Sequence, residues 1–207
     1  MKHVLLINNE RDADDMGWNF RLERALKQIE PGLMITVLHH QALNDEEFRK
    51  INPSHTIFYG RVTHHWDMKE ILEDYRPELE FLRKTEHPTL CICAGHQLLG
   101  IAHGCDMDKM IQCEDMDILE TGYCRITKDK PCRLFENLPS PFFGYNQHRD
   151  ELKQIPEGFE RTATGNMCAI QAMQKIGAPV FGLQFHPEWA IDQFPAGRMI
   201  LENFLSI

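Results

Sequence analysis

Short apolar runs alternate with amphipathic segments along the first half of the chain. The runs at 3–8, 33–38, 56–59 and 89–93 have the length and bulk of buried strands. The segments 17–29, 44–50 and 67–84 are predicted as helices, the first from apolar residues at largely helical spacing. This alternation is typical of parallel strands that are joined by crossover helices.

Local signals refine the predicted helices. Pro31 and Gly32 stop the first one, since neither residue continues a helix well. Asn44 stands where an N-cap would accept hydrogen bonds from the free N–H groups of the second helix. Pro77 lies inside the third and predicts a kink or a break there.

The second half of the chain has a different pattern. From about 117 to 180, short strands and turns alternate densely, which predicts an antiparallel extension. The run 181–185 then returns to the main sheet, and a helix over 197–204 closes the chain. We therefore predict the α/β class, with a doubly wound, mostly parallel sheet, flanking helices and a small antiparallel extension, in one domain over 1–207.

Composition narrows the class of protein. A chain of 207 residues with 43% hydrophobic content can bury a sizeable core without disulfides. No apolar run approaches the roughly 20 residues of a membrane span, and the net charge of −9 argues against a nucleic-acid-binding surface. The seven cysteines are scattered, as free thiols in a reducing compartment are, and match no zinc-site spacing. We expect a cytoplasmic protein that needs no metal or cofactor and binds neither membrane nor nucleic acid.

The segment 90–100 is a candidate nucleophile site. It predicts a buried strand that delivers Cys93 onto a sharp turn opening a helix, with the small residue Cys91 two positions before and Gly95 two positions after. At the start of a helix, free N–H groups and the helix dipole favour thiolate over thiol. A lone cysteine is more often a core residue, so the prediction needs a partner base.

A candidate base lies near the end of the chain. The apolar run 180–185 is followed by His186, Pro187 and Glu188. In an extended segment, residues two apart point to the same side, so Glu188 can bond one nitrogen of His186 and leave the other to face Cys93. The carboxyl ends of sheet strands are also where doubly wound folds place their sites. The sequence therefore predicts a triad of Cys93, His186 and Glu188.

These two motifs resemble those of the class I glutamine amidotransferases. The family pairs a C-x-G-H-Q nucleophile segment with a terminal Q-F-H-P-E, which stand here at 93–97 and 184–188. The segments 142–172 and 197–204 are similar to the family's S-H-x-D region and closing helix, so the resemblance covers most of the chain. It implies a flavodoxin-like fold and hydrolysis of the glutamine side-chain amide through a thioester on Cys93.

The resemblance also implies further site residues. The backbone N–H groups of Ala94 and Gly60 would stabilise the oxyanion, while Gln97 and the backbone around Gln147 and His148 would hold the amino-acid end of glutamine. The chain departs from the family in three places. The usual Gly-Gly-Pro loop is replaced by Tyr59, Gly60 and Arg61, and the usual serine before His148 is Gln147. Arg61 is interpreted either as a contact for the substrate carboxylate or as a solvated residue.

Three functions stay open from the sequence. The first is a glutaminase subunit that passes ammonia to a separate synthetase, and the segments near 148–150 and 156–159 look most like the amidotransferase part of GMP synthase. The second is a freestanding γ-glutamyl hydrolase, in which the changed loop at Tyr59 and Arg61 admits a larger leaving group. The third, of another class, is a catalytically silent binding or regulatory protein on the same fold.

Overall fold

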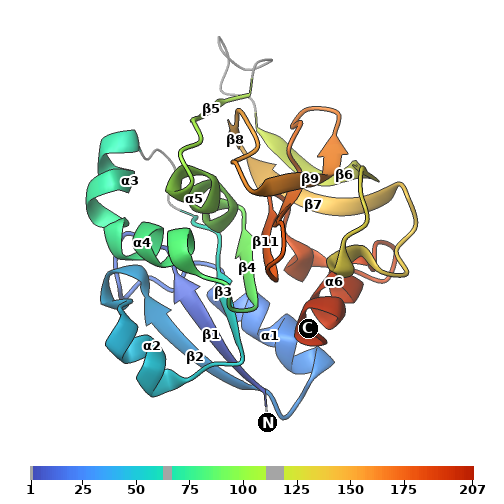
Figure 1. The fold of residues 1–207 in the computed structure, drawn as a ribbon. Helices are drawn as coiled ribbons and strands as arrows, with labels where there is room; N and C mark the ends of the chain where they lie inside the picture. Colours follow the sequence, from blue (N-terminus) through green and yellow to red (C-terminus); the bar gives the residue numbers. More distant parts are fainter. Residues whose placement is uncertain (1, 63–66, 111–118) are drawn as a thin grey trace.

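The computed structural model describes residues 2–62, 67–110 and 119–207. Nine strands form one sheet in the order β2-β1-β3-β4-β11-β10-β9-β6-β7 (Figure 1). Its first five strands are parallel, and this confirms the predicted fold class. They are β1 (His3–Asn8), β2 (Met34–His39), β3 (His55–Phe58), β4 (Thr89–Ile92) and β11 (Val180–Leu183).

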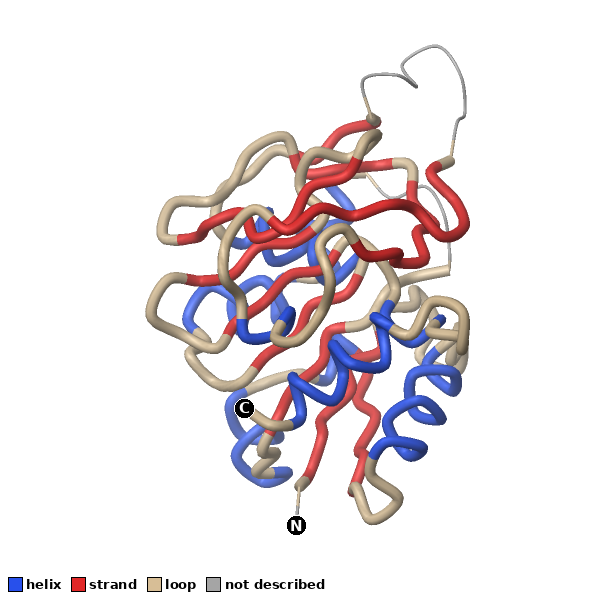
Figure 2. Tube along the Cα trace, turned by 90° about the vertical axis from the view of Figure 1, so that its right-hand side faces the viewer, coloured by secondary structure: helices blue, strands red, loops and turns tan. Residues whose placement is uncertain are grey.

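The antiparallel extension continues the same sheet beyond β11. It lies above the parallel strands in the view of Figure 2. Residues 117 and 118 of the predicted extension lie outside the described residues. Its strands are β6 (Glu120–Lys128), β7 (Phe142–His148), β9 (Phe159–Gly165) and β10 (Ala172–Lys175), and a separate antiparallel pair is formed by β5 (Met107–Lys109) and β8 (Asp150–Leu152).

Helices cover both faces of the parallel strands. They are α1 (Asn19–Ile29), α2 (Asp45–Ile51), α3 (Met68–Asp74), α4 (Arg76–Lys84), α5 (Ala94–Ala102) and α6 (Ala196–Leu205). Val4 and Leu6 of β1 join the core beneath α1 and α6, while Leu5 and Ile7 join the core beneath α3, α4 and α5. Alternate residues of one strand thus feed two cores, as expected of a doubly wound sheet.

The predicted helix boundaries hold with small shifts. The third predicted helix is broken into α3 and α4 at Tyr75, with Pro77 in the first turn of α4, where a missing N–H costs little. The Asn44 side chain accepts hydrogen bonds from two N–H groups of α2, as an N-cap does. The first helix begins at Asn19 rather than at Gly17, which has a φ of +48° and belongs to a turn. Among the described residues, no helix has the length and apolar character needed to cross a membrane.

Candidate active site

Cys93 lies at the carboxyl end of β4, on a strained turn. Its φ of +52° is in a region that side chains other than glycine rarely adopt, and such strain clusters at functional sites. The turn is held on both sides: the Cys93 N–H donates to the Leu183 carbonyl of β11 at 2.8 Å, and the Cys93 carbonyl accepts from Gln97 N–H at 3.1 Å. Helix α5 begins at the next residue, so its first N–H groups surround the thiol.

Gly95 explains how the helix can start so close to the sheet. A Cβ added at Gly95 would overlap the backbone carbonyl of Phe58 in β3. The absence of a side chain therefore allows α5 to pack directly on the strand. His96, one residue on, is fully buried, and burial lowers its pKa to about 3, which leaves a neutral ring at physiological pH.

His186 and Glu188 form a buried pair facing the end of β4. The His186 Nδ1 group donates to Glu188 Oε1 at 2.7 Å, and both side chains are at most 4% exposed. The predicted reason for this contact is wrong, since β11 ends at Leu183 and Glu188 lies in a 3₁₀ turn, η4 (Pro187–Trp189). A turn after Pro187, rather than extended alternation, folds the carboxylate back onto the imidazole.

Charge around His186 favours its protonated form. Burial alone would lower the pKa of His186, but the charges of Glu188 and Cys93, and hydrogen bonds to both, outweigh it and raise the pKa well above the usual 6.5. Because Nδ1 is bonded to Glu188, Nε2 is the nitrogen left to face the thiol. The three side chains can therefore hold a thiolate and an imidazolium together.

The loop after β3 presents a backbone N–H group to this pair. A Cβ added at Gly60 would lie 3.0 Å from His186 Cε1 and 3.4 Å from Cys93 Cβ, so Gly60 packs directly against both side chains. The preceding carbonyl, of Tyr59, accepts a hydrogen bond from Asn9 Nδ2 at 2.9 Å. In a trans peptide the N–H points opposite to the carbonyl, so this bond turns the Gly60 N–H away from Asn9.

Arg61 does not face the substrate space. Its guanidinium is 2% exposed, pairs with Glu70 at 3.1 Å and donates to the hydroxyl of Tyr75 at 2.8 Å. Both of the predicted roles for Arg61, a carboxylate contact and a solvated residue, are therefore wrong. The buried ion pair instead anchors the loop to α3.

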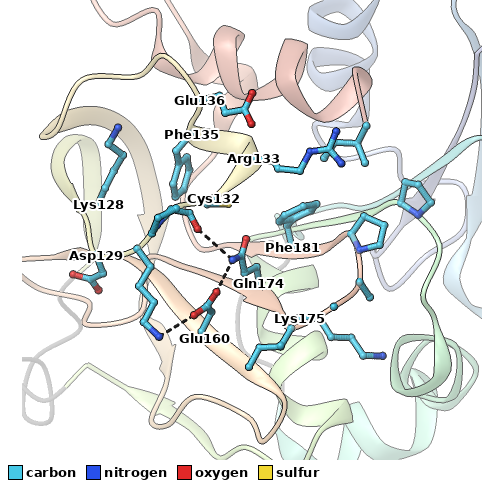
Figure 3. Close-up of a pocket in the computed structure, with 18 of the residues that line it drawn as sticks. Lys128, Asp129, Cys132, Arg133, Phe135, Glu136, Glu160, Gln174, Lys175 and Phe181 are labelled. Atoms are coloured by element: carbon cyan, nitrogen blue, oxygen red, sulfur yellow. Dashed lines mark hydrogen bonds and ion pairs between the residues drawn. The ribbon is translucent and has the colours of Figure 1, made fainter.

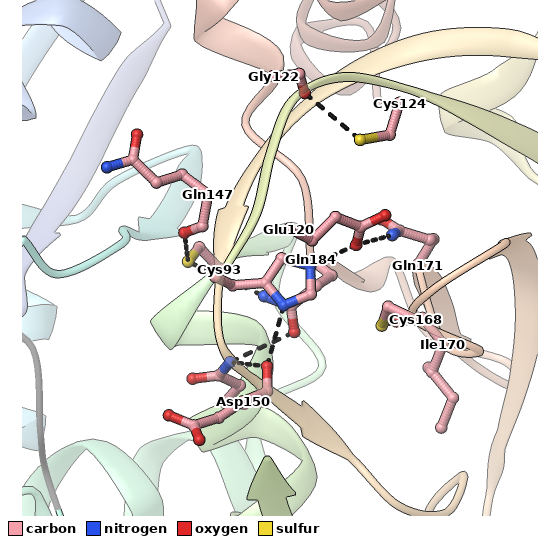
Figure 4. Close-up of polar contacts among 12 residues, drawn as sticks. Cys93, Glu120, Gly122, Cys124, Gln147, Asp150, Cys168, Ile170, Gln171 and Gln184 are labelled. Atoms are coloured by element: carbon pink, nitrogen blue, oxygen red, sulfur yellow. Dashed lines mark hydrogen bonds and ion pairs between the residues drawn. The ribbon is translucent and has the colours of Figure 1, made fainter. Parts of the chain in front are cut away.

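The other predicted substrate residues surround Cys93 from the side of the extension (Figure 4). The Gln147 carbonyl lies 3.9 Å from Cys93 Sγ. Gln97 Nε2 donates to the Asp150 carbonyl at 2.9 Å and so ties α5 to β8. The His148 ring is held by Glu120 at 2.8 Å and by the Asp150 carbonyl at 3.1 Å, which leaves its backbone as the part able to meet a substrate.

The structure adds residues that the sequence reasoning did not assign. Gln184 Nε2 lies 3.9 Å from Cys93 Sγ, and its position two residues before His186 was a signal for a shared side. The Trp18 ring meets the His186 ring edge-on, with centroids 6.3 Å apart. Nothing in the local sequence placed Trp18 there. It lines a space of about 10 Å³ next to His186, together with Gln147 and the loop at 59–62.

A much larger groove, of about 1040 Å³, lies at the opposite end of the sheet (Figure 3). Pro88 and Pro179, which precede β4 and β11, line it, whereas Cys93 and His186 follow the carboxyl ends of those strands. Its Cys132 thiol has a pKa raised to about 11, chiefly by burial, so it stays protonated. The groove therefore lacks an activated thiol, and we place the candidate active site at Cys93.

The described residues also bear on metal binding. Among them, no group of three or more His, Cys, Asp or Glu side chains is arranged to hold a metal ion. The polar groups of Cys93, His186 and Glu188 are instead hydrogen-bonded to one another through the imidazole.

Comparisons with known proteins agree with this geometry. Residues 12–207 match the family model described as glutamine amidotransferase class-I. The chain is 30% identical over 204 residues to the glutamine-hydrolysing subunit of GMP synthase from Methanobrevibacter smithii, covering 99% of this chain and 95% of that relative. It is 37% identical over 120 residues to the same subunit of Methanocaldococcus jannaschii, and this match spans 58% of the chain and 60% of the relative's length.

Solved structures show the same fold. A protein from Thermoplasma acidophilum, described as a candidate GMP synthase subunit, superimposes with a TM-score of 0.79 at 21% identity, covering 100% of this chain and 93% of that one. A glutamine amidotransferase from Thermotoga maritima superimposes with a TM-score of 0.72 at 18% identity, covering 99% and 96%. At these identities, the likeness concerns the arrangement of the backbone.

Proposed function

This chain belongs to the class-I glutamine amidotransferases, and from that premise we propose that it hydrolyses the side-chain amide of glutamine and supplies the ammonia to a separate synthetase. The observation that carries the proposal is the strained Cys93 turn facing the buried His186–Glu188 pair. Since the similar proteins of known name are glutamine-hydrolysing subunits of GMP synthase, we propose a GMP synthetase as the partner. We also propose a single domain that works in the cytoplasm.

The first half of the reaction transfers the glutamyl group to sulfur. The Cys93 thiolate attacks the side-chain carbonyl carbon of glutamine and forms a C–S bond, while the carbonyl oxygen becomes an oxyanion. When this intermediate collapses, the C–N bond breaks and imidazolium His186 gives its proton to the departing nitrogen. The products are ammonia and a γ-glutamyl thioester on Cys93.

Backbone groups stabilise the oxyanion. The N–H of Ala94, at the start of α5, has no acceptor within the helix, and the Gly60 N–H is turned away from Asn9 by the bond that Asn9 makes to the Tyr59 carbonyl. Two such fixed donors lower the energy of the charged intermediate more than that of the neutral amide. In this proposal, Gln97, Gln147 and the backbone of His148 hold the amino-acid end of the substrate.

The second half of the reaction releases glutamate. Neutral His186 takes a proton from water, the resulting hydroxide attacks the thioester carbonyl, and the C–S bond breaks to restore the thiolate. Glu188 keeps the imidazole oriented through its 2.7 Å hydrogen bond during both halves.

The contacts around the changed loop favour glutamine over bulkier γ-glutamyl compounds. The Tyr59 and Arg61 side chains point to Glu188 and Glu70 rather than widening the site. The space beside His186 that the described residues line measures about 10 Å³. A small leaving group such as ammonia fits these walls better than a peptide does.

Replacement of Cys93 by alanine tests the proposal. We expect the parent chain, mixed with its synthetase partner, to release glutamate from glutamine, and the Cys93→Ala variant to lose that activity by about 10⁴-fold or more while unfolding at the same urea concentration. A glutamine-like chloroketone should label Cys93 in the parent chain alone. Retained turnover in Cys93→Ala contradicts the mechanism. Faster turnover of γ-glutamyl peptides than of glutamine supports the hydrolase, and silence towards all substrates and labels supports the binding protein.

A further inference from the structure

Tyr59 makes a contact that the proposed reaction does not use. It is the first residue beyond β3 and is 1% exposed. Its hydroxyl donates to Glu188 Oε1 at 2.6 Å, and the same oxygen accepts from His186 Nδ1 at 2.7 Å. One carboxylate oxygen therefore carries two short hydrogen bonds, from the imidazole and from a phenol 129 positions away in the sequence.

The proton of the phenol has a fixed place. Burial, the charge of Glu188 and the hydrogen bond between them raise the pKa of Tyr59 well above its usual value of 10. The phenol is therefore protonated at physiological pH, and an ionised carboxylate can only accept. Tyr59 is a permanent donor to Glu188, whichever protonation state His186 has.

The orientation of the carboxylate depends on these two bonds. The other oxygen, Glu188 Oε2, is buried and has no hydrogen-bond partner among residues 2–62, 67–110 and 119–207. If the phenol were removed, the imidazole would be the one remaining donor to Glu188 within that part of the chain. The carboxylate would then be free to turn about its contact with His186, and its charge would be less well stabilised.

Tyr59 also joins this pair to the oxyanion loop. Its carbonyl accepts from Asn9 and its peptide bond carries the Gly60 N–H, while its ring lies edge-on to His186 with centroids 6.2 Å apart. Movement of the carboxylate and movement of the loop are thus linked through one residue.

We propose that Tyr59 is a positioning residue for the Glu188–His186 pair: its hydroxyl fixes the Glu188 carboxylate and offsets part of its charge, so that His186 releases its proton more readily. The role rests on the proposed glutamine hydrolysis, in which His186 alternates between acid and base. Without the phenol, Glu188 attracts the imidazolium more strongly and holds it less precisely.

The Tyr59→Phe variant removes the hydroxyl and keeps the ring. We expect kcat for glutamine hydrolysis to fall about tenfold, with KM within about twofold of the parent value, because substrate contacts are unchanged. We also expect the pKa of His186, measured by NMR of ¹⁵N-histidine-labelled protein, to rise by roughly one pH unit.

Tyr123→Phe is the matched control. The Tyr123 hydroxyl donates to the Trp189 carbonyl at 2.6 Å, so its loss loosens the turn that carries Glu188 without touching the carboxylate. We expect this variant to keep the parent pKa of His186. An unchanged His186 pKa in Tyr59→Phe, or an equal shift in both variants, overturns the proposal. Because the NMR measurement needs no turnover, an inactive parent chain would refute the proposed function while the role of Tyr59 is still tested.

Discussion

The ends of β3 and β4 both contribute to the candidate site, but they are held in different ways. At the end of β4, the strand, the strained turn and the helix follow one another in sequence, and Gly95 lets the helix lie on β3. At the end of β3, Gly60 is placed by a side chain from another strand end, Asn9, and by packing against His186. The comparison teaches that one end is shaped by local geometry and the other by contacts distant in sequence.

The comparison first predicts that Gly95→Ala damages the fold. The added methyl group would overlap the Phe58 carbonyl, and backbone in the centre of a sheet cannot move aside cheaply. We expect the free energy of unfolding, measured in urea, to fall by about 3 kcal/mol. Gly32→Ala is the control, since its methyl group would meet no atom within 4 Å. Equal stability of the two variants would mean that β4 and α5 do not depend on this close packing.

Gly60→Ala should instead damage activity. Its methyl group would lie 3.0 Å from His186 Cε1, which is part of a side chain that can shift by a few tenths of an ångström. We expect kcat/KM for glutamine to fall by about 10²-fold, because displacement of a base costs rate steeply, with a smaller loss of stability than in Gly95→Ala. Steady-state kinetics and urea unfolding on both variants separate the two effects. The distinction between the strand ends is lost if Gly60→Ala unfolds while keeping its activity.

The pH dependence of stability sharpens the comparison at the end of β11. Burial opposes protonation of His186, but Glu188 and Cys93 raise its pKa above the unfolded value of 6.5. A raised folded pKa means that the stabilisation is fully present below about pH 6.5 and is lost as the pH rises through the folded pKa. The loss should amount to about 1.4 kcal/mol for each pH unit by which the folded pKa exceeds the unfolded one. Urea unfolding across this pH range should show it in the parent chain and much less of it in Glu188→Gln.

Much of the fold was predictable because its signals are local. Asn44 caps its helix and Pro77 breaks the third predicted helix, since both act through the backbone of their own segment. The meeting of His186 and Glu188 was also expected, although a turn after Pro187 brings it about. The roles of Tyr59 and Arg61 were not predictable, because each depends on a partner elsewhere in the chain, Glu188 for one and Glu70 for the other.

The pairing of β11 with β4 has a consequence for how the chain acquires its reactivity. The hydrogen bond from Cys93 to Leu183, and the approach of His186, require a strand from near the end of the chain to insert beside one from its middle. Such a long-range contact forms late in folding, after local helices and neighbouring strands. During synthesis, Cys93 therefore emerges as an ordinary thiol, and it becomes a nucleophile when the last strand closes the sheet.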